Sequence, residues 1–276
     1  MTENVAAKSE DRAIEHVIAV MSGKGGVGKS VITGLLSVAL QRQGLRVGVL
    51  DGDLNGPSIA RMFGTEIAPS VAENGNIEPL VSQSGIKIMS MSMFAENEDP
   101  LVWRGPMLSS AFKQFYNNVE WGALDYLLVD APPGTSDVPM TILQSLPLDG
   151  VVIASSPHRM ATAVVKKCIN MVHQFKSNVL GVVENMAYFL APDGEYCEIF
   201  GPSSGLELAA MAHAPLLGQL PLDATLAALC DASRIEEYHA EAFDALTANL
   251  LKLLDLQRSE IGGKEHDHAY GTIVTI

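Results

Sequence analysis

Short apolar runs alternate with amphipathic stretches along most of this chain. The first run, residues 16–21, leads into a glycine-rich stretch, and residues 30–43 then place apolar side chains at helical spacing. Gly44 suits the end of that helix, and residues 46–50 form a second apolar run that closes on Asp51. The pattern predicts a strand, a tight loop, a helix and a second strand.

Later apolar runs have the length and composition of buried strands. Helical patterns separate most of these runs, which lie at residues 86–91, 126–129, 151–154, 179–183 and 216–220. This alternation predicts an α/β fold with a doubly wound, mainly parallel sheet that is covered by helices on both faces. Residues 65–85 are rich in Pro, Asn, Gly and Ser and predict an irregular excursion, or a hairpin, at the sheet edge.

The length of 276 residues fits one large α/β domain better than two independent ones. We expect this single domain to span residues 14–256, with flexible polar tails at residues 1–13 and 257–276. No apolar run approaches the roughly 20 residues that cross a bilayer. The first residues also lack the apolar segment of a secretory signal, so we expect a cytoplasmic protein without stable membrane association.

Charge and cysteine content narrow the possible roles further. The formal net charge of -14 repels phosphate backbones, and no strong basic patch is visible, so nucleic acid is not an expected partner. The three cysteines, Cys168, Cys197 and Cys230, are too few and too scattered for a disulfide framework. This usage agrees with a reducing compartment.

The strongest chemical signal is the segment GKGGVGKS at residues 23–30, which matches G-x-x-x-x-G-K-[ST] between a predicted strand and a predicted helix. Its glycines let backbone N–H groups surround phosphates, and the helix N-terminus adds the positive end of its dipole. We expect Lys29 to reach the β- and γ-phosphates and Ser30 to ligate Mg²⁺. The alternative is a glycine-rich turn without a ligand, and the complete motif in this context argues against it.

Three aspartates complete the expected phosphate chemistry. Asp130 follows a buried apolar run, as a Walker B carboxylate does, and is expected to hold the Mg²⁺ shell together with Asp51. Asp53 lies closer to the phosphates, and we assign it to positioning the attacking water. The alternatives are a turn cap at Asp130 and a helix N-cap at Asp53.

Lys24 is a second lysine inside the phosphate loop. In this respect the chain resembles the deviant Walker A ATPases, which include MinD, ParA, the nitrogenase iron protein and the Mrp proteins. In those families this lysine contacts the nucleotide bound to the other protomer. The resemblance therefore implies a nucleotide-dependent homodimer in which Lys24 neutralises charge across the interface, whereas the alternative is a solvated loop lysine.

Within that class the chain is most similar to the Mrp family of iron-sulfur cluster carriers, over about residues 15–254. Five blocks carry the similarity in order: DGDLNGPS at 51–58, WRGPM at 103–107, DAPPGTSD at 130–137, VENMAYF at 183–189 and EIFG at 198–201. The resemblance implies a P-loop ATPase that binds Mg-ATP, carries a cluster to an unknown client protein and uses slow, partner-coupled hydrolysis as a switch. It also implies that Asn185 and Pro221 border the adenine, although Asn185 could be a plain turn residue.

Two departures from the family pattern bear on function. Val31 stands where the family usually has a threonine near the α-phosphate. The family's Cys-Pro-x-Cys-Gly is replaced by LAPDGEYC at residues 190–197, which leaves Cys197 as a possible residual cluster ligand. A [4Fe-4S] cluster normally takes four thiolates, so we expect no conventional cluster bridging a dimer. A nucleotide-dependent regulator or scaffold, or a MinD- or ParA-like switch, is the alternative function.

These arguments define three groups of site residues. The nucleotide-binding group is Gly23, Gly25, Gly26, Val27, Gly28, Lys29, Ser30, Val31, Asn185 and Pro221. The catalytic group is Lys24, Lys29 and Asp53, and the Mg²⁺ group is Ser30, Asp51 and Asp130.

Overall fold

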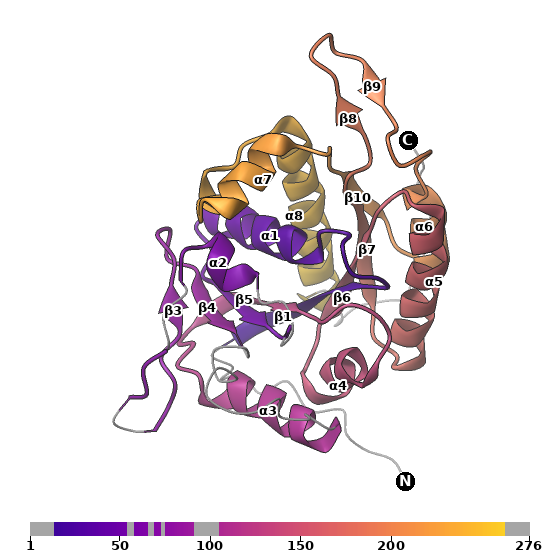
Figure 1. Cartoon of the computed structure of the whole chain (residues 1–276). Coiled ribbons are helices and arrows are strands. Elements are labelled where there is room, and N and C mark those ends of the chain that lie inside the picture. Colours follow the sequence, from indigo (N-terminus) through magenta and orange to yellow (C-terminus); the bar gives the residue numbers. More distant parts are fainter. Residues whose placement is uncertain (1–13, 54–57, 66–68, 73–74, 91–104, 263–276) are drawn as a thin grey trace, which may run out of the picture.

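Helices flank both faces of a central sheet in the computed structural model, which describes residues 14–53, 58–65, 69–72, 75–90 and 105–262 (Figure 1). The strands are β1 (Ile14–Ser22), β2 (Val47–Asp51), β3 (Leu80–Val81), β4 (Lys87–Ser90), β5 (Leu124–Asp130), β6 (Gly150–Ser155), β7 (Val179–Glu184), β8 (Phe189–Leu190), β9 (Tyr196–Cys197) and β10 (Leu216–Gln219). The helices are α1 (Lys29–Arg42), α2 (Ile59–Met62), α3 (Gly105–Asn118), α4 (Asp137–Ser145), α5 (Arg159–Gln174), α6 (Gly205–Ala212), α7 (Ala224–Asp231), the 3-10 turn η2 (Ile235–Glu237) and α8 (Glu241–Gly262).

The strands of the main sheet follow the order β10-β7-β6-β1-β5-β2-β4-β3. All neighbours pair in parallel except β3 and β4, which are antiparallel at one edge. The predicted doubly wound, mainly parallel α/β fold is confirmed. The edge position of β3 also agrees with the irregular excursion that the composition of residues 65–85 predicts.

The strands read as continuous apolar runs because helices cover both faces of the sheet. Along β1, Val17, Ala19 and Met21 pack into the core under α3, α4, α5 and α6. The alternate residues Ile18 and Val20 pack into the opposite core under α1, α2, α7 and α8. Figure 1 shows these two helical layers on either side of the sheet.

The end of the last helix can be compared with the predicted limit of the domain. Helix α8 continues to Gly262, six residues beyond the expected boundary at residue 256. Residues 1–13 and 263–276 lie outside the described residues, as do parts of the first two family blocks at 54–57 and 103–104. The division into one domain and two flexible tails stays a prediction.

Candidate phosphate site at the carboxyl ends of the strands

Three neighbouring strands bring the predicted site residues to one edge of the sheet. Strand β1 leads into the phosphate loop, and its neighbour β5 ends at Asp130, which is in register with Val20. Strand β2 ends at Asp51, directly beside Asp130. The loop and both carboxylates therefore meet at the carboxyl ends of the strands, where open α/β sheets bind ligands.

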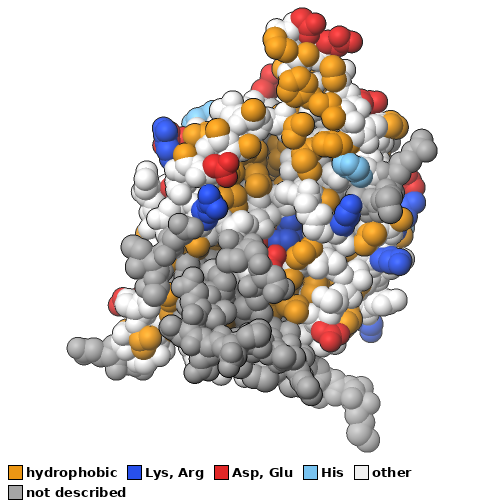
Figure 2. Space-filling view, viewed as in Figure 1, with side chains coloured by type: hydrophobic (Ala, Val, Ile, Leu, Met, Phe, Trp, Pro, Cys, Tyr) orange, Lys and Arg blue, Asp and Glu red, His pale blue; other side chains and the backbone are white. Residues whose placement is uncertain are grey.

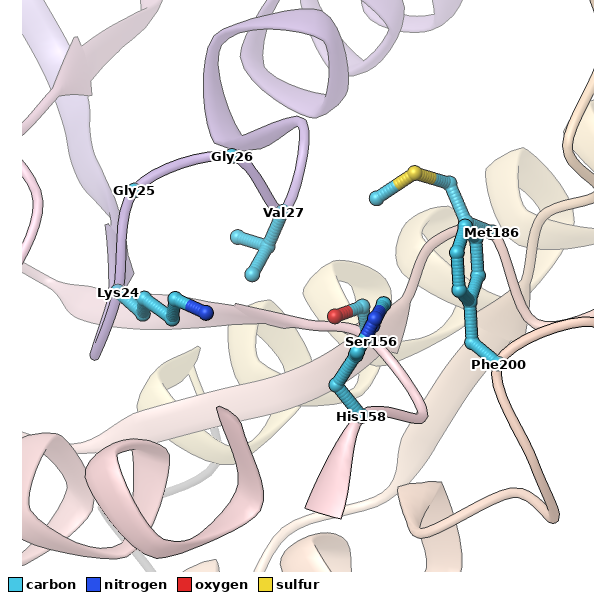
Figure 3. Close-up of a pocket in the computed structure, with 8 residues that line it drawn as sticks. All are labelled: Lys24, Gly25, Gly26, Val27, Ser156, His158, Met186 and Phe200. Atoms are coloured by element: carbon cyan, nitrogen blue, oxygen red, sulfur yellow. The ribbon is translucent and has the colours of Figure 1, made fainter. Parts of the chain in front are cut away.

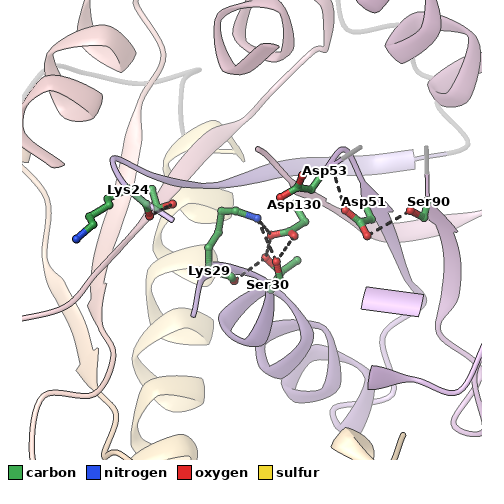
Figure 4. Close-up of polar contacts among 9 residues, drawn as sticks. Lys24, Lys29, Ser30, Asp51, Asp53, Ser90 and Asp130 are labelled. Carbon is green, nitrogen blue, oxygen red and sulfur yellow. Dashed lines mark hydrogen bonds and ion pairs between the residues drawn. The ribbon is translucent and has the colours of Figure 1, made fainter. Parts of the chain in front are cut away.

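Asp130 is fully buried and accepts from three side chains of α1 (Figure 4). The ammonium of Lys29 lies 2.6 Å from its Oδ1. Ser30 Oγ donates to Oδ2 at 2.6 Å, and Thr33 Oγ1 donates to Oδ1 at 2.7 Å. A buried carboxylate needs such partners to offset the loss of water. Thr33 was not among the expected site residues, although its i+4 spacing from Lys29 places both on one helix face.

Asp51 lies beside this cluster and is also fully buried. Its Oδ1 accepts from the backbone N–H of Asp53 at 3.0 Å, and its Oδ2 accepts from Ser90 Oγ at 3.3 Å. Burial, together with the negative charge of Asp130, raises the pKa of Asp51 to about 7. Because the negative charge of Asp130 disfavours a second negative charge on Asp51, the pair favours the binding of an added cation.

The oxygen atoms of Ser30, Asp51 and Asp130 form a donor set that suits Mg²⁺. Within the described ranges no group of three or more His, Cys, Asp or Glu side chains is placed to hold a metal. Mg²⁺ does not require one, because it commonly uses one or two carboxylates and takes its other ligands from water and substrate phosphates. The residues present therefore fit Mg²⁺ with a bound phosphate.

The phosphate loop is shaped by glycines and held by one amide. Gly26 and Gly28 have φ of 81° and 79°, in the left-handed region that favours glycine. A Cβ on Gly28 would lie 2.1 Å from Nδ2 of Asn185. That same Nδ2 donates to the carbonyl of Val27 at 3.1 Å. Asn185 therefore fixes the loop directly, which is more than a plain turn residue does.

The other expected residues lie around this centre. Lys24 is exposed and extends away from Lys29 and Asp130 (Figure 4). Val31 is half-buried in the first turn of α1, and Pro221 is half-buried just after β10. The structure thus gathers Lys29, Ser30, Asp51 and Asp130 into one cluster and leaves Lys24 outside it.

The three cysteines lie on three different elements and are unpaired. Cys197 is half-buried on β9 of the β8–β9 hairpin, which projects from the body of the molecule (Figure 1). Burial raises the pKa of Cys168, in the core on α5, to about 12. Burial likewise raises the pKa of Cys230, on α7, to about 11. Neither of these two thiols is disposed to ionise and bind metal.

A parallel sheet with a phosphate loop between β1 and α1, and an aspartate at the end of β5, defines a P-loop NTPase. The family model named ParA, described as "NUBPL iron-transfer P-loop NTPase", matches residues 13–253. The chain therefore belongs to this family of iron-transfer P-loop NTPases. This result confirms the resemblance that the sequence blocks indicate.

Similar proteins agree with this assignment. An iron-sulfur cluster carrier protein of Clostridium perfringens is 42% identical over 236 residues, which cover 83% of each chain. One of Methanocaldococcus jannaschii is 43% identical over 76% of this chain and 73% of its own. A nucleotide-binding protein of Archaeoglobus fulgidus, solved in complex with ADP, has a TM-score of 0.73 at 42% identity and covers 84% of this chain and 92% of its own.

More distant structures share the fold alone. The cell division ATPase MinD of Pyrococcus furiosus has a TM-score of 0.65 at 21% identity and covers 86% of this chain and 99% of its own. None of the helices in the described part of the chain is both long and apolar enough to span a membrane.

Proposed function

We propose that this chain is a cytoplasmic ATPase that binds Mg-ATP at residues 23–30 and hydrolyses it as a nucleotide-dependent homodimer. The observation that carries the proposal is the cluster of Lys29 and Ser30 on Asp130, at the end of an intact phosphate loop. The ADP complex of the 42% identical Archaeoglobus fulgidus protein supports nucleotide binding by this chain. The unpaired state of all three cysteines supports a reducing compartment.

Different residues are proposed to bind the phosphates, the Mg²⁺ and the adenine. Lys29 exchanges its contact with Asp130 for the β- and γ-phosphates, because a triphosphate carries more charge than one carboxylate. Ser30, Asp51 and Asp130 would hold Mg²⁺, which offsets phosphate charge when bound. The remaining proposed nucleotide contacts come from Gly23, Gly25, Gly26, Val27, Gly28 and Val31 around the phosphates and from Asn185 and Pro221 beside the adenine.

Calorimetric titration with Mg-ADP and Mg-ATP tests this binding site. Lys29→Ala should abolish detectable binding because no other described lysine or arginine pairs with Asp130 in the cluster. Lys166→Ala is the matched control, since Lys166 is exposed on α5 and pairs with Glu207. Equal nucleotide affinity in Lys29→Ala and the wild type would overturn the assignment.

Hydrolysis should depend on two residues that binding does not need. We propose that Asp53 orients the attacking water and that Lys24 stabilises the transferred charge from the other protomer. In other phosphoryl-transfer enzymes, a positive side chain from a second chain raises the rate on the order of 10³-fold. Lys24→Ala should therefore lower the hydrolysis rate by a similar factor and leave the affinity for ADP unchanged. Normal turnover by this variant in a phosphate-release assay would refute the trans-lysine mechanism.

The names of the relatives suggest that this chain carries an iron-sulfur cluster. The number of its cysteines argues against a conventional [4Fe-4S] cluster that bridges a dimer. Each protomer offers Cys197 alone in the β8–β9 hairpin, so a dimer supplies two of the four thiolates that a [4Fe-4S] cluster normally takes. We therefore propose that the chain does not hold a conventional bridging cluster. A nucleotide-dependent regulator or scaffold of cluster assembly is the second candidate function.

Anaerobic reconstitution with iron and sulfide distinguishes these functions. The expected result is well below four irons per dimer, with no stable visible absorbance. Cys197→Ser tests the residual ligand, and Cys230→Ser on α7 is its control. About four irons per dimer, with absorbance that disappears only in Cys197→Ser, would show that this chain carries a cluster after all.

A further inference from the structure

Thr33 is a buried hydroxyl residue of α1 that follows the phosphate-loop motif. Its relative exposure is 0%. The hydroxyl Oγ1 lies 2.7 Å from Oδ1 of Asp130 and 3.1 Å from the backbone carbonyl oxygen of Lys29. A threonine hydroxyl carries one proton, so it donates to one of these acceptors at a time. The shorter distance favours donation to the carboxylate, which is also the stronger acceptor.

The surroundings of Thr33 do not by themselves require a polar side chain. Its neighbours Ile32, Leu35 and Leu36 are fully buried in the core that α1 shares with the sheet. In such a core an apolar side chain of similar shape avoids the cost of removing a hydroxyl from water. A bond to the carbonyl four residues earlier does not offset that cost, because such bonds do not stabilise a helix. The contact with Asp130 therefore explains the hydroxyl at this position.

The side chains that donate to Asp130 use different oxygens of its carboxylate. Ser30 donates to Oδ2, whereas the Lys29 ammonium and the Thr33 hydroxyl both contact Oδ1. In the proposed nucleotide complex, Lys29 moves to the phosphates and Ser30 ligates Mg²⁺. Among the described residues, Thr33 is then the one side-chain donor that stays on Asp130.

Thr33 does not lie where a ligand would touch it. A pocket beside the phosphate loop is lined by residues that include Lys24, Val27 and Ser156 (Figure 3), and Thr33 is not among the described residues of its lining. Thr33 is instead fully buried one helical turn after Lys29. Its influence on a bound ligand therefore passes through Asp130.

We propose that Thr33 is a positioning residue of the Mg²⁺ site. Its hydroxyl remains on Oδ1 of Asp130 after Lys29 has moved, and it holds Oδ2 toward the metal shell. The inference rests on the Mg-nucleotide site proposed above. A hydrogen bond to a carboxylate of a metal site fixes its orientation, and loss of such a bond typically lowers metal affinity about 10- to 100-fold. Without the hydroxyl, Oδ1 of Asp130 would be buried without this donor once Lys29 leaves.

The test titrates Mn²⁺ into the full-length protein with ADP bound and protein in excess over ADP. Mn²⁺ accepts the oxygen ligands that suit Mg²⁺, and its EPR signal reports binding. Thr33→Val removes the hydroxyl and keeps the shape of the side chain, so the dissociation constant for Mn²⁺ should rise about 10- to 100-fold. Thr33→Ser keeps the hydroxyl and should restore the wild-type value. The calorimetric affinity of Thr33→Val for ADP in chelator should match that of the wild type.

Ser37→Ala is the matched control. Ser37 is another fully buried hydroxyl residue of α1, but it donates to the carbonyl of Gly34 at 2.7 Å. Its removal should leave the Mn²⁺ affinity unchanged. Thr33→Ala also lacks the hydroxyl and takes the place of Thr33→Val if circular dichroism shows that the valine variant does not fold.

The possible outcomes separate this inference from the ATPase proposal. Wild-type Mn²⁺ affinity in the variants without the hydroxyl would overturn the role of Thr33 and leave the nucleotide site intact. An equal loss in Thr33→Ser would assign the effect to packing of the methyl group and overturn it as well. An equal loss of ADP affinity with and without Mn²⁺ would show that Thr33 shapes the phosphate loop instead. A wild type that binds ADP but no Mn²⁺ would refute the metal site itself, whereas a wild type that binds no ADP would refute the nucleotide site.

Discussion

Two buried carboxylates, Asp51 and Asp130, lie side by side at the ends of β2 and β5, and Lys29 pairs with Asp130. Asp130 receives the Lys29 ammonium and two hydroxyl groups. Among the residues that the structure describes, Asp51 receives the hydroxyl of Ser90 and a backbone N–H, and its pKa is raised by burial and by Asp130 to about 7. The difference in partners explains why Asp51 is the carboxylate that favours a proton or a cation.

The raised pKa of Asp51 predicts a pH-dependent stability in the absence of Mg²⁺. Between the ordinary value of 3.8 and about 7, the folded protein holds a proton that the unfolded chain has released. The free energy of unfolding from this group therefore falls as pH rises through that window. Asp51→Asn keeps an acceptor oxygen. Its free energy of unfolding, relative to that of the wild type, should rise by roughly 1–3 kcal/mol from pH 5 to pH 8.

Urea denaturation at both pH values, in chelator-treated buffer, measures this difference. Asp193→Asn, at an exposed position of the β8–β9 hairpin, is the control and should change stability little at either pH. An Asp51→Asn difference that stays constant with pH would show that Asp51 is ionised in the folded protein throughout this range.

At the scale of elements, the end of β7 connects the phosphate loop to the segment before α6. Asn185 donates to the loop carbonyl of Val27, and the preceding residue Glu184 accepts from the N–H of Ser204 at 2.8 Å. Gln219 on β10 donates to the same carboxylate at 2.8 Å. Glu184 is fully buried and has no lysine or arginine partner among the described residues, so neutral donors alone satisfy it.

This arrangement predicts a strong effect of truncation at Glu184. Glu184→Ala leaves the Ser204 and Gln219 donors without their acceptor and opens a cavity, which should cost about 2–4 kcal/mol of unfolding free energy. Glu184→Gln keeps one acceptor and the volume, so its cost should be clearly smaller. Chemical denaturation measures both, with the exposed Glu207→Ala as control. Equal stability of Glu184→Ala and the wild type would exclude a role for this carboxylate in holding the segment.

At the scale of the whole molecule, ligand binding should stabilise the fold because the phosphate loop exists only in the folded chain. Mg-ADP at 100 times its dissociation constant should add about 2.7 kcal/mol. For a domain of this size that corresponds to a rise in melting temperature of about 5 °C or more. Thermal melts of the wild type and Lys166→Ala should show this rise, and Lys29→Ala should not. A similar rise in all three would place the nucleotide elsewhere.

The sequence by itself determined the main parallel strands and the phosphate loop, because both depend on neighbours along the chain. Strands buried on both faces leave continuous apolar runs, so residues 16–21 and 46–50 were recognisable within one or two residues of β1 and β2. The loop at residues 23–30 is a contiguous motif whose glycines and helix start are local features. The family blocks, also local, predicted the family correctly.

Only the tertiary structure decided which distant residues meet. Strand β5 lies between β1 and β2, an order that chain sequence does not reveal, and this order puts Asp130 beside Asp51. The contact of Asn185 with Val27 joins residues 158 positions apart, and the pocket that Ser156 shares with Lys24 joins two separate loops. Such contacts depend on strand order, register and side-chain direction, which packing of the whole core determines.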